Sequence, residues 1–217
     1  MQWVAKKHLP LTFVALAFTA VIAGAFAILS TESQAPETKP IDAEEALSIS
    51  CFETSTATIR ISLTDQCPSP LISLGGGALT ESQTASGEVD ELHPLLAARF
   101  EAAHIAADRE GVTLYITSGF RTQARQEALF ANAIKKYGNE TEAAKWVLPA
   151  HFSHHPQGLA IDVNYPKDPA GAKWLEANGA RFGLCRVYAN EWWHFEGVIA
   201  PGQICPAMAE NALVDLG

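Results

Sequence analysis

Imidazole and carboxylate side chains are concentrated in one short stretch of the sequence, HFSHHPQGLAIDVNY at residues 151–165. Three histidines, His151, His154 and His155, precede an apolar run that contains the acid Asp162. Imidazole nitrogens and carboxylate oxygens are the ligands that zinc takes in hydrolytic enzymes. The stretch therefore indicates a metal site, and a solvated histidine cluster on a loop is the alternative interpretation.

A second stretch, NEWWHFE at residues 190–196, supplies another histidine with an acid three residues before it. On a regular strand, alternation puts Trp192, His194 and Glu196 on one face and Trp193 and Phe195 on the other. Glu191 then has the wrong parity to stand beside His194, unless it lies on a turn or bulge that leads into the strand. A glutamate placed there is suited to act as a general base on water activated by a metal.

The acid Asp162 lies inside GLAIDVNY, which has the composition of a buried strand. Alternation sends Leu159, Ile161 and Val163 to one face and Gly158, Ala160 and Asp162 to the other. Because a buried carboxylate is costly without a cation or hydrogen-bond donors, we expect positive charge in the space above its small neighbours. Asp162, an imidazole of the 151–155 cluster and His194 would make a tetrahedral zinc site with one open position, with Glu191 left unbound.

Helices and short strands must position these side chains. Apolar residues at helical spacing predict a helix over residues 93–111, with His104 near its apolar stripe as an ordinary helix-face residue. VTLYITS predicts a half-buried strand over residues 112–118, and EWWHFEGV predicts a final strand over residues 191–198. Further helices are expected over residues 122–138, from about residue 141, and over residues 169–179. This order of elements predicts an α+β fold with helices packed on a small antiparallel sheet.

The first 30 residues are expected to direct export. Lys6 and Lys7 precede an uncharged apolar run over residues 9–29. The length of this run favours an uncleaved membrane anchor with a cytoplasmic amino terminus, while Ala25-Phe26-Ala27 also offers a signal-peptide cleavage pattern. In both cases we expect the rest of the chain on the periplasmic or cell-surface side, tethered to the cytoplasmic membrane if the run is retained.

Composition divides the remaining chain into three parts. Residues 31–48 are rich in small and polar residues and predict a solvated linker. Residues 49–88 predict a small extension, with a strand in TATIRISL and a flexible glycine-rich loop. Residues 89–217 predict the main domain.

Four cysteines are expected to form two disulfides in an oxidising compartment. Of the three possible pairings we favour the local one, Cys51 with Cys67 and Cys185 with Cys205. Each bond then closes a short loop, which contributes about 3 kcal/mol in the chain-entropy model. A four-cysteine zinc site is the alternative, but its close Cys-x-x-Cys spacings are absent from the sequence.

The formal net charge is −9, and basic residues cluster only before the apolar run. This balance argues against nucleic acid or an anionic surface as the main partner. We expect the chain to be monomeric.

Spacing within both stretches matches known motifs. S-x-H-x-x-G-x-A-x-D is matched by Ser153, His155, Gly158, Ala160 and Asp162, and E-x-x-H by Glu191 and His194. Upstream, Ser118-Gly119-Phe120-Arg121 and Gln126 extend the likeness, so that it spans roughly residues 89–198. In these motifs the chain resembles the VanY-type D-alanyl-D-alanine carboxypeptidase family, zinc peptidases that trim peptidoglycan stem peptides.

The resemblance implies roles for individual residues. His155, Asp162 and His194 would bind zinc, Glu191 would be the general base, and Arg121 would stabilise the oxyanion. The motif register alone selects His155 over His151 and His154.

Other positions of the motifs imply a substrate groove. Ser153 and Gln126 resemble positions that line it, although each could instead make only a turn or helix hydrogen bond. Trp192 and Trp193 are expected to form core and groove wall rather than a sugar platform.

The resemblance implies a zinc D,D-carboxypeptidase acting on stem peptides that end in D-Ala-D-Ala. Because EWWHF is also similar to the D-Ala-D-Ala dipeptidase branch, a dipeptidase is one alternative, with an endopeptidase or L,D-carboxypeptidase as another. A zinc-holding cell-wall binding module without catalysis is a third, since the hedgehog signalling domain shares this fold. The presence of both Glu191 and Arg121 argues against it, because a binding module needs no base beside an open metal position.

Overall fold

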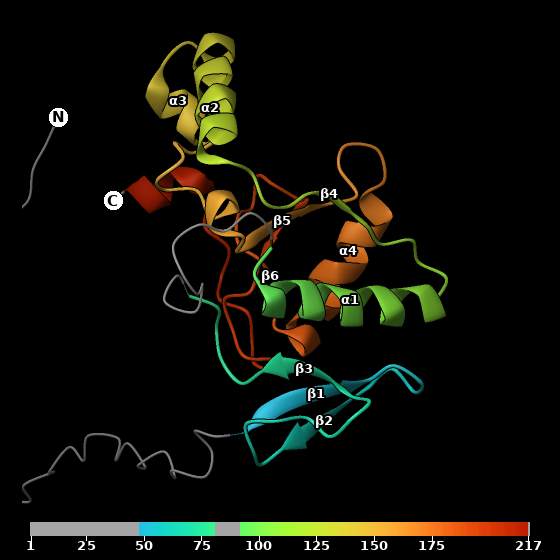
Figure 1. Ribbon diagram of the computed structural model, residues 1–217. Coiled ribbons are helices and arrows are strands. Elements are labelled where there is room, and N and C mark those ends of the chain that lie inside the picture. The colour runs from blue at the N-terminus through green and yellow to red at the C-terminus, as the bar shows by residue number, and fades with distance from the viewer. Residues whose placement is uncertain (1–47, 81–91, 217) are drawn as a thin grey trace, which may run out of the picture. The chain divides into compact units, whose positions relative to one another are not determined.

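The structure is a computed structural model that describes residues 48–80 and 92–216 (Figure 1). The predicted export segment, the predicted linker up to residue 47 and residues 81–91 of the predicted loop and domain boundary lie outside the described residues. Within the described ranges, no helix is both long and apolar enough to cross a membrane.

A four-stranded antiparallel sheet carries the motif residues, in the strand order β4-β5-β7-β6. Its strands are β4 (Ile116–Ser118), β5 (Ala160–Val163), β6 (Cys185–Arg186) and β7 (His194–Glu196). In the register of β5 and β7, Asp162 lies opposite His194 and Ala160 lies opposite Glu196. Two segments 32 residues apart in the chain therefore present their polar side chains on the same face of the sheet.

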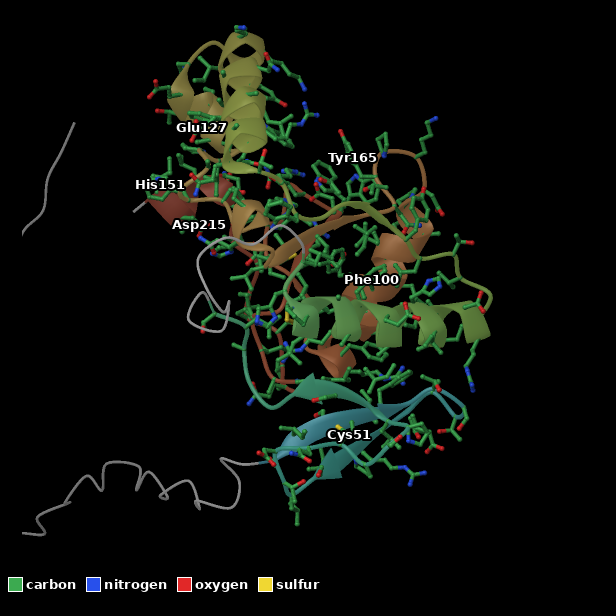
Figure 2. The ribbon with its side chains drawn as sticks, viewed as in Figure 1. Cys51, Phe100, Glu127, His151, Tyr165 and Asp215 are labelled. Atoms are coloured by element: carbon green, nitrogen blue, oxygen red, sulfur yellow. A yellow bond between two sulfur atoms is a disulfide. The ribbon has the colours of Figure 1, made fainter. Side chains whose placement is uncertain are left out.

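Helices cover the other, apolar face of this sheet. The buried side chains of β5 and β7 form one core with α1 (Pro94–Arg109) and α4 (Pro169–Asn178), in which Phe100 is labelled in Figure 2. The remaining helices are α2 (Gln123–Tyr137), α3 (Glu140–Ala144) and the 3₁₀ helices η3 (His155–Gln157), η4 (Gly179–Phe182) and η5 (Ala212–Leu216). The predicted α+β fold with small antiparallel sheets is confirmed.

Several predicted helix ends are also confirmed. The Thr122 side chain accepts a hydrogen bond from Arg125 N at the start of α2, and Gly138 ends the helix with φ +96°. The helix predicted from about residue 141 begins at Glu140, because the Asn139 side chain caps it by accepting from the Glu142 amide.

The two predicted strands of the main domain are shorter than expected. Of residues 112–118 only those of β4 form a strand, because the Asn164 side chain bonds to backbone groups of the residues before it. It accepts from Tyr115 N at 3.0 Å and donates to Thr113 O at 2.9 Å. The final strand begins at His194 rather than Glu191, because residues 191–193 form a turn closed by a hydrogen bond from His194 N to Glu191 O at 3.4 Å.

This late strand start changes the parity of the tryptophans. Trp192 was expected on the face of His194, but it packs against the hydrophobic core, while Trp193 lines the pocket that contains His194. Alternation does not apply to either residue because both belong to the turn. The expected roles of core and groove wall are nevertheless found, one for each ring.

The amino-terminal extension is a three-stranded antiparallel sheet of order β2-β1-β3, where the sequence predicted one strand. Its strands are β1 (Ile49–Glu53), β2 (Thr58–Ser62) and β3 (Ile72–Gly75). Phe52 and Leu74 of this sheet belong to the same core as α1 and β5. The Cys51–Cys67 disulfide lies within the extension and the Cys185–Cys205 disulfide joins β6 to the carboxy-terminal segment, in the pairing favoured from the sequence.

Arg99 of α1 is a fully buried cation whose observed partners are backbone carbonyls. Its Nε donates to Leu74 O at 2.9 Å, and its terminal nitrogens donate to the carbonyls of Gly77, Gly183, Gly197 and Ile199. Burial lowers the pKa of Arg99 to about 10, so the guanidinium keeps its charge at neutral pH. These bonds connect the extension to the segment that directly follows β7.

Replacing Arg99 with methionine should therefore destabilise the fold. Several buried carbonyls would lose their donor at about 1–3 kcal/mol each, partly offset because a buried charge is also removed. We expect a net loss of about 3 kcal/mol and a fall of roughly 6–12 °C in Tm by thermal unfolding. The control is Arg109→Met, because Arg109 donates to two carbonyls of the extension from an exposed position on the same helix. Equal shifts for the two variants would contradict a special role for Arg99.

Candidate active site

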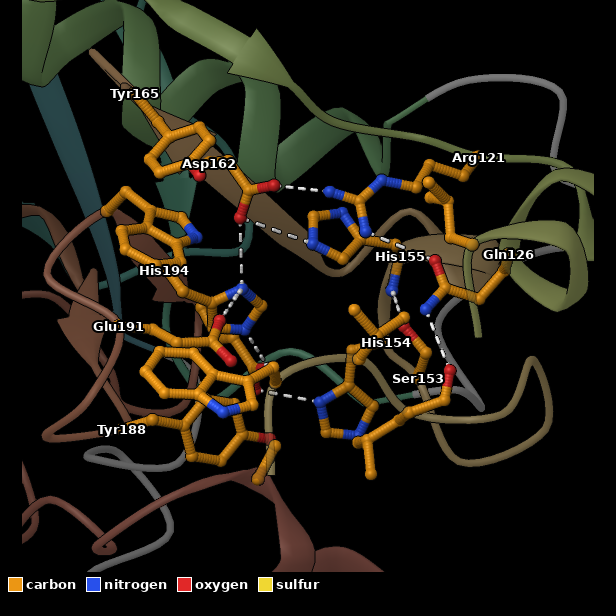
Figure 3. A pocket seen from close by; sticks show the side chains of 17 residues that line it. Arg121, Gln126, Ser153, His154, His155, Asp162, Tyr165, Tyr188, Glu191 and His194 are labelled. Atoms are coloured by element: carbon orange, nitrogen blue, oxygen red, sulfur yellow. Dashed lines mark hydrogen bonds and ion pairs between the residues drawn. The ribbon is translucent and has the colours of Figure 1, made fainter. Parts of the chain in front are cut away.

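His155, Asp162 and His194 converge on one another in the wall of a pocket (Figure 3). All three side chains are buried, and their potential ligand atoms lie within 4.8 Å of one another. Asp162 Oδ1 lies 3.4 Å from His155 Nε2 and 3.2 Å from His194 Nδ1. The three residues that the motifs single out thus form one cluster of two nitrogens and one carboxylate.

Backbone contacts orient His155 within this cluster. It begins the 3₁₀ helix η3, which ends at Gly158 with φ +70°, a conformation that favours glycine. Its Nδ1 lies 2.7 Å from Gly119 O, and the partner of a carbonyl must be an N–H. The ring therefore directs an unprotonated Nε2 towards Asp162. Burial lowers the pKa of His155, which favours this neutral form.

The other two histidines of the stretch lie elsewhere. His151 is exposed and contacts the ring of Phe152. His154 lines the pocket, but its Nδ1 pairs with Glu196 Oε2 at 2.8 Å. Among the three, His155 is the one that reaches the cluster.

Glu191 lies on the turn that leads into β7, as its parity required. Its Oε2 lies 4.0 Å from His194 Nδ1, and its side chain is buried at the edge of the cluster. Burial raises the pKa of Glu191 to about 7. Its carboxyl group can therefore gain and lose a proton near neutral pH, which is the property of a general base.

Arg121 follows β4 and contacts the cluster through Asp162. Its Nε donates to Ser118 Oγ at 2.8 Å, one terminal nitrogen donates to Gln126 Oε1 at 3.1 Å, and the other donates to Asp162 Oδ2. Of its five N–H donors, two are left without a partner among the described residues. The guanidinium is thus fixed in place and can still donate to a ligand in the pocket.

Gln126 and Ser153 both line the pocket, and their observed bonds are with neighbouring protein groups. Gln126 is fully buried, and it joins Arg121 to Leu148 O, to which its amide donates at 2.9 Å. Ser153 Oγ accepts from the backbone amide of His155 at 3.4 Å. Gln126 therefore holds Arg121 beside the cluster, and Ser153 contacts the backbone of the cluster residue His155.

The sequence interpretation gave no role to Glu196 or Tyr188, although both lie against His194. Glu196 Oε1 lies 2.9 Å from His194 Nε2, and the Tyr188 ring stacks on the imidazole with centroids 5.1 Å apart. Tyr188 OH in turn donates to Asp215 of η5. The contact between His194 and Glu196 could have been predicted only from their alternation, because residues two apart on a strand lie on the same face. The hydrogen bond from Tyr188 to Asp215 requires the approach of the carboxy-terminal segment, which no local pattern predicts.

The charges of the pocket suit a divalent cation. Three buried carboxylates, Asp162, Glu191 and Glu196, face the single guanidinium of Arg121. Although burial opposes ionisation, hydrogen bonds from the histidines lower the pKa of Glu196 to about 2, and the pKa of Asp162 is also held below its usual range. Burial lowers the pKa of His194, but the two acids outweigh it and raise the value to about 10, so a proton on Nδ1 partly balances the negative charge. A cation at the cluster would take the place of that proton, and two imidazoles with one carboxylate are a donor set that zinc accepts.

The model of the VanY family, described as D-alanyl-D-alanine carboxypeptidase, matches residues 90–200. This segment is about half of the chain and contains every residue of the cluster. The chain belongs to the VanY family. The resemblance inferred from the motifs is confirmed.

Two curated relatives of this VanY-family chain carry different activities in their names. A D-alanyl-D-alanine carboxypeptidase of Enterococcus faecalis is 29% identical over 140 residues, covering 54% of this chain and 51% of the relative. The peptidoglycan L-alanyl-D-glutamate endopeptidase CwlK of Bacillus subtilis is 32% identical over 94 residues, covering 43% of this chain and 54% of the relative. The chain spans about half the length of these relatives, and their names point to different peptide bonds.

Solved structures of VanY-family and related enzymes are also similar to the chain. VanYB in complex with D-alanine-D-alanine is 24% identical with a TM-score of 0.45, covering 51% of this chain and 75% of that chain. The LdcB LD-carboxypeptidase is 23% identical with a TM-score of 0.44, covering 55% and 65%.

Proposed function

We propose that this chain is a zinc-dependent D-alanyl-D-alanine carboxypeptidase that trims peptidoglycan stem peptides. The observation that carries the proposal is the convergence of His155, Asp162 and His194, with Glu191 and Arg121 beside them, inside a segment that matches the VanY family. A base and a free cationic donor beside a metal-binding cluster favour a hydrolase over a binding module.

In the proposed mechanism three of the five residues bind the metal, one is the general base and one stabilises the oxyanion. His155 Nε2, an Asp162 carboxylate oxygen and His194 Nδ1 would hold a zinc ion, which would supply a Lewis acid for the scissile carbonyl and lower the pKa of water. Glu191 accepts a proton from the attacking water and then donates it to the departing amine of D-alanine. The unused N–H groups of Arg121 donate to the carbonyl oxygen as it becomes negative.

The pocket favours a substrate longer than a free dipeptide. A second hollow, along α2, shares Trp146, Tyr165 and Trp193 with the pocket of the cluster. Because a carboxypeptidase releases one residue, additional length can serve only the acyl side of the scissile bond. A stem peptide has several residues on that side, whereas free D-Ala-D-Ala has one.

Incubation with a defined pentapeptide stem and with free D-Ala-D-Ala, followed by mass spectrometry, tests the proposal. We expect a tetrapeptide and free D-alanine from the stem, with a clearly higher kcat/KM than for the dipeptide, and no product after zinc is removed with a chelator. Preferred cleavage of the dipeptide, or an internal cut in the stem, would replace this assignment with a dipeptidase, an L,D-carboxypeptidase or an endopeptidase. If no peptide is cut, the chain is a binding module.

A further inference from the structure

Glu196 is a buried acid that the proposed mechanism does not use. It is 4% exposed, and each of its carboxylate oxygens meets a different imidazole. Oε1 lies 2.9 Å from His194 Nε2, and Oε2 lies 2.8 Å from His154 Nδ1. Ala160 lies opposite Glu196 in the sheet register, and its small side chain leaves room for this arrangement.

The contact with His194 decides which ring nitrogen can bind a metal. An imidazole that binds a metal must be neutral, and a neutral imidazole carries one N–H. If the proton is on Nδ1, it points at Asp162 Oδ1, 3.2 Å away, and occupies both the nitrogen and the oxygen of the cluster. If it is on Nε2, it points at Glu196 and leaves both groups available. A metal on Nδ1 displaces the proton that faces Asp162, and Glu196 accepts the proton that stays on Nε2.

His155 has the same arrangement with a different acceptor. Its Nδ1 proton is held by the Gly119 carbonyl at 2.7 Å, which leaves Nε2 for the cluster. The Gly119 carbonyl thus orients the ring of His155, as the Glu196 carboxylate orients the ring of His194. Ligands to metals are commonly oriented in this way by an acceptor on the second ring nitrogen.

We propose that Glu196 is a positioning residue that keeps the His194 proton on Nε2 and so leaves Nδ1 and Asp162 free for the metal. This inference rests on the proposed function, because it requires that the cluster binds zinc. His154 completes the arrangement: it binds the second carboxylate oxygen and prevents the group from rotating away from His194. The two adjacent histidines thereby have different functions: His155 is a proposed metal ligand, and His154 fixes Glu196.

Zinc affinity measured by competition with a chromogenic chelator tests the inference without any assay of activity. Removal of an outer-sphere partner typically weakens metal binding about 10- to 100-fold, and we expect a loss of this size for Glu196→Ala. Glu196→Gln keeps an oxygen that can accept from Nε2 and should recover most of the loss. His154→Ala should give a smaller loss than Glu196→Ala. The matched control is His151→Ala, an exposed histidine three residues away, which should bind zinc like the wild-type chain.

A second measurement separates positioning from simple stability. In the zinc-loaded wild-type protein, ¹⁵N NMR of the imidazoles should show a protected Nε2–H on His194, retained in Glu196→Gln and His154→Ala and lost in Glu196→Ala. A residue with only a structural role would lower the Tm of the zinc-free protein and leave both the zinc affinity and this proton unchanged. If Glu196→Ala does not fold, the signal and zinc affinity of Glu196→Gln and His154→Ala still decide the question.

Wild-type zinc affinity in Glu196→Ala, or a wild-type signal that shows zinc on Nε2 of His194, would overturn the inference and leave the proposed function intact. Absence of zinc binding by the wild-type chain would overturn both. The two failures are therefore distinguishable.

Discussion

Replacing Glu191 with alanine should abolish turnover of the stem peptide while the protein keeps its zinc. Glu191 lies beside the cluster, 4.0 Å from His194 Nδ1, and is not one of the three proposed ligands. Loss of a general acid and base typically lowers kcat by about 10²- to 10⁴-fold. KM should change little, because the side chain acts mainly in the transition state.

Glu191→Gln is the stricter form of this experiment. Glutamine keeps the shape of the side chain and loses only the ability to take up a proton, so its activity should be as low as that of the alanine variant. Zinc content by elemental analysis should stay at one ion per chain in both variants. Retained activity in either variant would falsify the assignment of Glu191 as base, and loss of zinc would instead make it a ligand.

Asp162→Asn should have the largest effect on metal content. The substitution removes the one anionic ligand from the cluster and leaves two imidazoles. We expect zinc affinity to fall by more than about 100-fold, beyond the loss typical for an outer-sphere partner. Activity should follow the zinc content, and excess zinc should restore part of it.

The matched control is Asp168→Asn at the start of α4. Asp168 caps that helix by accepting from Ala170 N, and asparagine caps a helix about as well as aspartate. This variant should bind zinc normally. Full zinc occupancy in Asp162→Asn at low free zinc would count against Asp162 as a ligand and against the cluster as the metal site.

Local patterns were enough to predict much of the candidate site. Alternation placed Asp162 on the polar face of its strand and required a turn at Glu191, and both features are present. The capping residue Thr122 and the stop at Gly138 also follow from local chemistry, since each satisfies backbone groups at one end of α2. These predictions depend on residues that are near one another in the chain.

Features that depend on long-range approach could not be predicted in this way. The role of Glu196 requires the pairing of β7 with β5. The short length of β4 results from the Asn164 side chain, which bonds to Tyr115, 49 residues away in the sequence. The buried state of Arg99 requires carbonyls from three separate segments. An arginine on a helix is ordinarily read as a surface residue, and nothing nearby in the sequence contradicts that reading.

The carbonyl partners of Arg99 also limit which part of this chain can be transferred to another protein. The family match begins at residue 90, yet Arg99 inside it donates to Leu74 and Gly77 outside it, and Leu79 N donates to Gly197 O just after β7. A chimera that grafts only the matched segment onto a foreign amino-terminal half would remove two of the five carbonyl acceptors of the buried Arg99 guanidinium. A transplant that keeps all of these acceptors must include β1 to β3 together with the matched segment, so the extension belongs to the smallest unit that can be transferred intact.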